Sequence, residues 1–292
     1  MQESLSLWIK GARPRTLPAA IAPVAVGTAC VSVEANATAN WSNAILALIV
    51  SLALQVAVNY ANDYSDGVRG TDDKRVGPLR LVGSGAKTAS AVKRAAFLSF
   101  GVAAIFGLIL ALLTSLWLLV VGVLCILAGW FYTGGKKPYG YFGLGEVFVF
   151  VFFGVVATTG TTFVIVEKLT ATSFTASLVV GALACALLAV NNLRDIDGDT
   201  LARKRTLAVR LGDKKARSFF VSLFVLALLA IFVLALSYPL ALLGLVGLGS
   251  AFTSIKRVRS GAVGSELISV LSMTGRTQIL TAITLSIGLI LS

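Results

Sequence analysis

The chain has 292 residues, of which 57% are hydrophobic and only 13% are charged, and its mean hydropathy is +0.90. Soluble domains usually have about 25% charged residues, so this composition excludes an ordinary soluble globular protein. The absence of histidine excludes Ser-His-Asp and Cys-His nucleophile systems, His-ligated zinc or haem, and histidine proton relays. We interpret the net charge of +12 as one that orients the protein and contacts anionic lipid headgroups in the bilayer, and we expect no nucleic-acid partner.

Nine apolar runs follow one another along the chain and predict membrane-spanning helices. Most are long enough to cross a hydrocarbon core of about 30 Å as a helix, and they lack the alternating polarity of barrel strands. The runs are residues 17–33, 41–58, 95–114, 116–132, 147–166, 174–190, 219–236, 240–255 and 277–291. We therefore predict an all-α polytopic membrane protein, a single domain over residues 1–292, with about nine transmembrane helices.

Basic residues lie on one side of this predicted topology. Of the 25 Lys and Arg residues, 24 fall in the N-terminal segment or in connections after even-numbered spans, and only Lys168 falls on the other face. Because basic residues stay on the cytoplasmic side, we predict a cytoplasmic N-terminus and a C-terminus outside.

Two groups of acidic residues follow the second and sixth spans, on the predicted cytoplasmic side. The chain has only 13 acids, and seven of them lie in these groups: Asp63, Asp66, Asp72, Asp73, Asp195, Asp197 and Asp199. Like charges repel by about 3 kcal/mol per pair at about 6 Å and an effective dielectric of about 20. We therefore expect cations to offset this repulsion. Asp72 and Asp73 are interpreted as loop acids that balance basic neighbours, and Asp197 as solvated.

The two groups occur in similar segments. AVNYANDYSDG, which begins at Ala57, matches AVNNLRDIDGD, which begins at Ala189. A match at a spacing of four spans predicts two pseudo-repeats of four helices, at approximately residues 11–135 and 136–255, followed by one more helix.

Oxygen ligands gather on one face of each helix end if the helices continue through these segments. Spacings of three and four residues bring together Asn59, Asp63 and Asp66 in the first motif, and Asn191, Asp195 and Asp199 in the second. Carboxylate and amide oxygens without His or Cys suit Mg²⁺, which often shares a substrate phosphate. Two such motifs predict Mg²⁺ ions that hold a polyphosphate, with nearby basic residues on its outer oxygens: Lys74, Arg75, Arg80, Arg194, Lys204 and Arg210.

Four stretches, in this order, resemble the UbiA superfamily of membrane-embedded prenyltransferases. They are GARPRTLPAAIAPVAVGT from Gly11, NYANDYSDGVRGTDDKRVGPLRLVGSG from Asn59, YTGGKKPYGYFGLGEVFVFVFFG from Tyr132 and NNLRDIDGDTLARKRTLAVRLG from Asn191. The resemblance covers almost the whole chain and is strongest to the branch that prenylates 1,4-dihydroxy-2-naphthoate. It implies a UbiA-type bundle in a bacterial cell (inner) membrane, with Mg²⁺ as cofactor and polyprenyl diphosphate and 1,4-dihydroxy-2-naphthoate as substrates. Demethylmenaquinone, for menaquinone biosynthesis, would form with loss of CO₂ and diphosphate.

The resemblance also implies roles for individual residues. The metal ligands would be Asn59, Asp63, Asp66, Asp195 and Asp199, with a further ligand from Asn191 or Asn192. Substitution of Asp63 or Asp195 is expected to abolish catalysis. Members of the superfamily bind diphosphate through a basic residue before the first span and another after the fourth. Arg15 (or Arg13) and Lys137 (or Lys136) match those places, beside Arg75, Arg80 and Lys204.

Glu146 begins the fifth span, and it is a candidate partner or base for a ring hydroxyl because histidine is absent. Four aromatic residues either line the ring pocket or belong to an interfacial belt: Tyr132, Tyr139, Tyr141 and Phe142. Likewise, the two prolines of the first span either bend the helix for a prenyl tail or are tolerated kinks.

Two alternative functions fit part of these observations. One is a UbiA-type prenyltransferase with a different aromatic acceptor. The other is a multi-pass secondary transporter, which would place its ion-coupling acids near the bilayer midplane on broken helices. Here the acids lie at helix ends on one face, which favours the enzyme.

Overall fold

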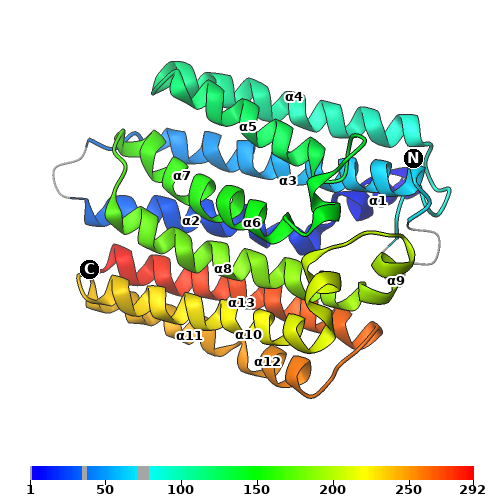
Figure 1. The fold of residues 1–292 in the computed structure, drawn as a ribbon. Helices are drawn as coiled ribbons and strands as arrows, with labels where there is room; N and C mark the ends of the chain where they lie inside the picture. The colour runs from blue at the N-terminus through cyan, green and yellow to red at the C-terminus, as the bar shows by residue number, and fades with distance from the viewer. Residues whose placement is uncertain (1, 35–37, 72–78) are drawn as a thin grey trace.

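Helices are the regular secondary structure throughout residues 2–34, 38–71 and 79–292, the parts of the chain that this computed structural model describes. They run side by side along one long axis, and the longer connections gather at the end of the bundle near the N-terminus (Figure 1). The all-α prediction is confirmed for these residues.

Five helices are long and apolar enough to cross a membrane: α3 (Ser42–Val68), α4 (Ala89–Leu113), the continuous helix Gly145–Val166, α8 (Ala171–Arg194) and α10 (Leu207–Ala235). The third of these comprises α6 (Gly145–Val149), the π-helical segment η4 (Phe150–Val156) and α7 (Ala157–Val166). The protein is thus a multi-pass membrane protein.

Two bent helix pairs raise the number of spans in the described residues to as many as seven, if each pair is one span. Leu5–Thr16 and Pro18–Val33 meet at 53°, and Pro239–Gly249 and Phe252–Arg259 meet at 47°. The first pair contains α1 (Gln2–Ala12) from Leu5 onward, η1 (Pro14–Thr16), α2 (Pro18–Cys30) and η2 (Val31–Val33). The second contains η5 (Pro239–Leu243), α11 (Gly244–Gly249) and α12 (Phe252–Arg259). Proline lacks a backbone N–H and is tolerated at a helix start, so Pro18 favours the break in the first pair. The bend of the second pair lies between Gly249 and Phe252, well after Pro239, which begins η5. The count of nine spans stays a prediction.

The remaining elements are α5 (Trp117–Phe131), η3 (Tyr139–Phe142), α9 (Ile196–Leu201) and α13 (Ser265–Ile290). Helix α8 is the most deeply buried of the five long spans and packs against α2, η4, α10 and α13. Its small residues permit this close approach. At the tightest point, a Cβ added to Gly154 of η4 would lie 2.5 Å from Gly181 Cα of α8.

Helices α4 and α5 have apolar side chains that no other part of the described protein covers. Leu98, Leu112 and Trp117 are 72%, 69% and 77% exposed. Such a surface suits contact with lipid, because a bilayer removes the cost of exposing apolar side chains to water.

Candidate active site

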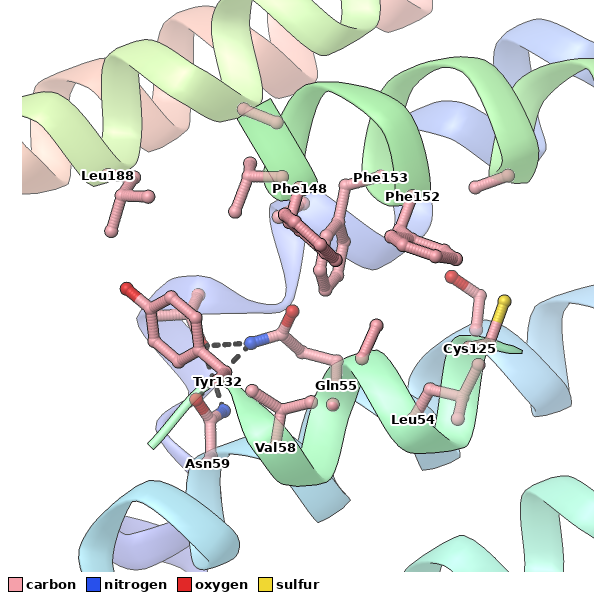
Figure 2. Close-up of a pocket in the computed structure, with 18 of the residues that line it drawn as sticks. Leu54, Gln55, Val58, Asn59, Cys125, Tyr132, Phe148, Phe152, Phe153 and Leu188 are labelled. Atoms are coloured by element: carbon pink, nitrogen blue, oxygen red, sulfur yellow. Dashed lines mark hydrogen bonds between the residues drawn. The ribbon is translucent and has the colours of Figure 1, made fainter. Parts of the chain in front are cut away.

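A cavity of about 830 Å³ lies within the bundle. One part, which we call the polar end, is lined by Arg13, Arg15, Asn59, Asp66, Arg80, Asn191, Asn192, Arg194 and Lys204. The other part, the apolar arm, is lined by Ala47, Val50, Leu54, Leu110, Leu118, Gly122, Cys125, Phe152, Val156, Gly160 and Val164. Figure 2 shows Asn59 and Tyr132 toward the polar end, with Phe152 and Cys125 farther along the arm. The cavity can therefore hold a ligand with a charged head and an apolar tail.

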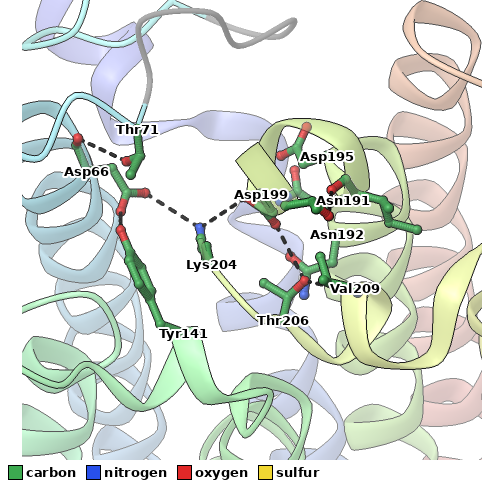
Figure 3. Close-up of polar contacts among 12 residues, drawn as sticks. Asp66, Thr71, Tyr141, Asn191, Asn192, Asp195, Asp199, Lys204, Thr206 and Val209 are labelled. Atoms are coloured by element: carbon green, nitrogen blue, oxygen red, sulfur yellow. Dashed lines mark hydrogen bonds and ion pairs between the residues drawn. The ribbon is translucent and has the colours of Figure 1, made fainter. Parts of the chain in front are cut away.

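The two acidic motifs meet at the polar end through Lys204 (Figure 3). Lys204 Nζ lies 3.8 Å from Asp66 Oδ2 and 3.8 Å from Asp199 Oδ1. The two carboxylate oxygens can therefore be no farther apart than twice that distance. Two segments far apart in sequence thus place their acids around one cation.

Asp66 is held from the other side by Tyr141. The Tyr141 hydroxyl donates a hydrogen bond of 2.8 Å to Asp66 Oδ1. The guanidinium of Arg69 and the ammonium of Lys204 lie 5.4 Å and 5.2 Å from the Tyr141 ring centroid, within the range of cation–π attraction. Burial raises the pKa of Tyr141, and the negative charge of Asp66 raises it further. The hydroxyl therefore remains a protonated donor at neutral pH.

Asp63 has a different environment from Asp66. Its buried carboxylate accepts hydrogen bonds from the backbone N–H groups of Leu81 (2.8 Å) and Val82 (3.0 Å). Among the described residues that line the cavity, Asp66 is present and Asp63 is not. Asp63 thus holds the segment after residue 78 against α3, and its role as a metal ligand stays a prediction.

Asn59 lines the cavity and also ties the N-terminal segment to α3. Its amide nitrogen donates to Ala12 O (2.8 Å) and Thr16 Oγ1 (3.0 Å), and its Oδ1 accepts from Gln55 Nε2 at 3.3 Å. Gln55 also donates to Thr16 Oγ1 at 3.1 Å. The sequence prediction missed Gln55 and Thr16. The available signal was a lone amide inside an apolar run, which is costly in a membrane unless it has a partner or a function.

The second motif departs from the continuous helix that we expected. Helix α8 ends at Arg194, Asp195 has non-helical dihedral angles (φ −95°, ψ 5°), and α9 begins at Ile196. Asp and Gly have low helix propensity, and the sequence here is DIDGD. The assumption of a continuous helix through this motif is therefore wrong at Asp195, whereas the common face of Asn191, Asp195 and Asp199 stays a prediction.

Arg194 organises the residues around this break. Its Nε and Nη2 lie 2.7 Å from the two Asp195 oxygens, and Nη2 also donates to Asn191 Oδ1 at 2.9 Å. Arg194 Nη1 is buried and has no hydrogen-bond partner among the described residues. Since Arg194 lines the cavity, this nitrogen is a candidate donor for an anionic ligand.

The predicted diphosphate-binding residues separate into three groups. Arg15, Arg80 and Lys204 line the polar end, as does the alternative Arg13, whose Nη2 donates to Asn59 O at 3.3 Å. Lys137 and its alternative Lys136 are exposed, and neither belongs to the described lining of the cavity. Arg75 lies outside the described residues, with Asp72, Asp73 and Lys74.

Glu146 is buried at the start of α6, with 4% of its surface exposed. Asn192 Nδ2 donates to Glu146 Oε1 at 2.9 Å, whereas Oε2 is buried and has no hydrogen-bond partner among the described residues. Asn192 itself lines the cavity. The adjacent asparagines thus differ in their contacts. Asn191 accepts a hydrogen bond from Arg194, and Asn192, which lines the cavity, donates one to Glu146.

An aromatic row of four side chains lines the cavity where the polar end meets the apolar arm. Figure 2 labels three of them, Tyr132, Phe148 and Phe152. Tyr132 meets Tyr139 edge-on at 5.5 Å between ring centroids, Tyr139 stacks on Phe148 at 3.9 Å, and Phe148 stacks on Phe152 at 5.9 Å. Tyr132 and Tyr139 were predicted candidates for a ring pocket, whereas Phe148 and Phe152 were missed. Their spacing of four residues on one helix face was the available signal.

The donor set at the polar end fits Mg²⁺ that is shared with a substrate. The described residues contain no group of three or more His, Cys, Asp or Glu side chains close enough to form a protein-only metal cage. They do place Asp66 and Asp199 on either side of a cationic nitrogen. Mg²⁺ is commonly bound by one or two carboxylates, with water and phosphate completing its shell.

These features define a class: a multi-pass helical membrane protein with an internal site for an amphipathic, anionic ligand. The profile of the UbiA prenyltransferase family matches residues 20–266. The chain belongs to this family.

Relatives of known name extend the match over nearly the whole chain. The 1,4-dihydroxy-2-naphthoate octaprenyltransferase of Mycobacterium tuberculosis is 49% identical over 280 residues, which cover 96% of this chain and 95% of that protein. The Escherichia coli protein of the same name is 35% identical and covers 98% of this chain and 95% of its own length. A UbiA homolog from Archaeoglobus fulgidus bound to GPP and Mg²⁺ has a TM-score of 0.70 at 13% identity, with 98% and 99% of the two chains covered. This structural likeness supports the fold.

Proposed function

We propose that this protein transfers a polyprenyl group from polyprenyl diphosphate to 1,4-dihydroxy-2-naphthoate in menaquinone biosynthesis. Relatives with this activity in their names are up to 49% identical to the chain. The structural observation that carries the proposal is a single cavity that joins Asp66 and Lys204 to the apolar arm, with Lys204 also contacting the Asp199 carboxylate. A prenyl diphosphate has the matching parts, since its head is anionic and its tail is apolar.

The bonds and electrons of the proposed reaction balance without an oxidant. The C–O bond between the prenyl group and diphosphate breaks, and diphosphate takes the electron pair. A C–C bond forms at the ring carbon that carries the carboxylate. That group leaves as CO₂, and its bonding electrons restore the aromatic ring. The product is therefore demethylmenaquinol, the reduced form of demethylmenaquinone.

The polar end supplies the groups that would bind the diphosphate. Arg15, Arg80 and Lys204 line it and carry the positive charge that attracts phosphate oxygens. Asp66 and Asp199 would hold Mg²⁺ beside the diphosphate, with Asn59, Asp63, Asn191, Asn192 and Asp195 as the other ligand candidates. When bound, Mg²⁺ makes diphosphate a better leaving group.

The apolar arm and the aromatic row would bind the rest of the donor. The arm excludes water from the tail, and the faces of Tyr139, Phe148 and Phe152 offer negative electrostatic potential to a developing allylic cation. Because water would capture such a cation, a dry aromatic wall favours transfer to the ring acceptor.

Glu146 is the proposed partner of a ring hydroxyl: it would accept the proton of that hydroxyl as the C–C bond forms and return it when CO₂ leaves, so the product keeps both hydroxyl groups. The Asn192 amide holds one Glu146 oxygen, and the buried second oxygen has no protein partner among the described residues. A carboxylate positioned in this way can accept a hydrogen bond or a proton from an acceptor ring that reaches Asn192. We further propose that this polar end faces the cytoplasm of a bacterial cell, in keeping with the positive-inside distribution of Lys and Arg.

Turnover by the purified protein in liposomes tests the proposal. With Mg²⁺ and a polyprenyl diphosphate, we expect release of CO₂ and diphosphate with 1,4-dihydroxy-2-naphthoate, and no release with 4-hydroxybenzoate. The reverse preference would assign the enzyme to another branch of the family. Undiminished turnover in chelator would contradict the role of Mg²⁺.

A further inference from the structure

Three glycines on three different helices line the cavity without a packing reason for being glycine. They are Gly107 of α4, Gly122 of α5 and Gly160 of α7. A Cβ added to any of them would meet no heavy atom within 4 Å beyond its local backbone. Gly129 also lines the cavity, but its added Cβ would lie 2.9 Å from a Val58 methyl. Glycine costs about 1 kcal/mol relative to alanine in a helix interior, so the open space at the first three positions calls for another explanation.

The three glycines occupy equivalent places relative to the closed end of the apolar arm. There the lining residues Leu110, Val164 and Leu118 belong to one hydrophobic cluster, which we infer closes the arm. Each of these three residues belongs to the same helix as one of the glycines and lies three or four positions from it. Residues at this spacing share a helix face. Each glycine therefore lies about one turn from the closed end.

Chain direction places all three glycines on the same side of this closed end. Helices α4 and α7 run away from the polar end, so Gly107 and Gly160 precede Leu110 and Val164. Helix α5 runs back toward the polar end, so Gly122 follows Leu118. In each case the glycine lies nearer the polar end. Gly160 lies 14 residues beyond Glu146, roughly 20 Å along the helix at 1.5 Å per residue.

We propose that Gly107, Gly122 and Gly160 determine the length of prenyl tail that the enzyme accepts. This inference rests on the proposed function, in which the tail occupies the apolar arm. The missing side chains keep the arm open for one helical turn above its closed end. A larger side chain at any of the three positions would fill that turn and exclude the distal units of a long tail. The proximal units of a short tail would not reach it.

The test compares Gly122→Leu and Gly160→Leu with the wild type on two donors, geranyl diphosphate and octaprenyl diphosphate. We expect the ratio of kcat/KM for the long donor to kcat/KM for the short donor to fall at least about tenfold, the effect of a modest misfit in an apolar pocket. Gly122→Ala, whose added Cβ contacts nothing within 4 Å, should shift the ratio less in the same direction. It provides a milder variant in case leucine impairs folding.

Gly101→Leu is the matched control. Gly101 also lies in α4 and also faces open space, but it is not among the described residues that line the cavity. We expect the donor ratio of Gly101→Leu to equal that of the wild type. An unchanged ratio in the Gly122 and Gly160 variants, or an equal change in Gly101→Leu, would overturn the inference.

A binding measurement separates this inference from the proposed function. The dissociation constants of the two donors are measured with Mg²⁺ and without any acceptor, by the shift in melting temperature. Weakened binding of octaprenyl diphosphate relative to geranyl diphosphate in Gly122→Leu supports the inference even if the naphthoate proves to be the wrong acceptor. Equal relative binding in wild type and variant overturns it, whatever the acceptor.

Discussion

Tyr141 donates a 2.8 Å hydrogen bond to one oxygen of Asp66, and the other oxygen of that carboxylate faces the Lys204 ammonium at 3.8 Å. The segment between α5 and α6 thereby orients an acid at the end of α3. The same segment contacts the chain just after the second motif, because Arg205 N donates to Tyr141 O at 3.1 Å. We therefore expect Tyr141 to position Asp66 for metal binding.

Tyr141→Phe should raise the Mg²⁺ concentration needed for half-maximal turnover by about tenfold. The change keeps the ring between its two cations and removes only the bond to a charged acceptor, and such bonds contribute about 1.5–3 kcal/mol. The measurement is turnover against Mg²⁺ concentration. Tyr238→Phe is the matched control, since Tyr238 bonds to Thr172 away from the site. An unchanged Mg²⁺ requirement in Tyr141→Phe would show that the bond does not position a ligand.

The effect of Tyr141→Phe should be the same at pH 7, 8 and 9. Burial and Asp66 raise the pKa of Tyr141 above its usual value near 10. A raised pKa means that the hydrogen bond is fully present below pH 10 and is lost only above that value. Mg²⁺ titrations at the three pH values check this. If the wild type and Tyr141→Phe differed in their Mg²⁺ requirement at pH 8 but not at pH 9, Tyr141 would not be protonated as expected.

Much of the bundle was predictable because membranes impose a simple rule. Every backbone polar group must be satisfied inside the span, so long apolar runs become helices. The exact number of spans was less predictable, because two candidates are bent pairs, one broken at Pro18 and the other between Gly249 and Phe252. The proposed pseudo-repeats remain untested by the helix packing.

The site was predictable only in part, for reasons of geometry. The acidic motifs follow from spacing along a helix, and Asp66 and Asp199 do approach each other. Spacing could not show that Asp63 is directed toward the backbone of residues 81 and 82, because that contact is tertiary. The sequence left two roles open for Tyr141, in a ring pocket or in an interfacial belt. Its bond to Asp66 is also tertiary.

Asp63→Ala and Asp66→Ala should therefore differ in stability. Asp63→Ala leaves two backbone N–H donors without their carboxylate, and each buried unsatisfied donor costs about 1–3 kcal/mol. Asp66→Ala removes a cavity-facing acid that accepts from Tyr141, and it should lose turnover with a smaller fall in melting temperature. Melting curves in detergent, measured beside turnover, check this prediction, and a wild-type melting temperature for Asp63→Ala would contradict a structural role for its carboxylate.

Lys204→Met should destabilise the protein in chelator more than in Mg²⁺ with diphosphate. The Lys204 side chain is 16% exposed and is the cation between Asp66 and Asp199. Methionine keeps the apolar stem but leaves the two carboxylates without that cation, which we expect to lower the apparent melting temperature by about 3–5 °C. Mg²⁺ held by the same acids would replace the missing charge and recover most of the loss, whereas turnover would remain low because a proposed diphosphate-binding residue is gone. The control is Lys215→Met, an exposed lysine of α10, which should show no difference between the two conditions. Equal destabilisation of Lys204→Met in chelator and in Mg²⁺ would mean that the ammonium and the metal do not share a site.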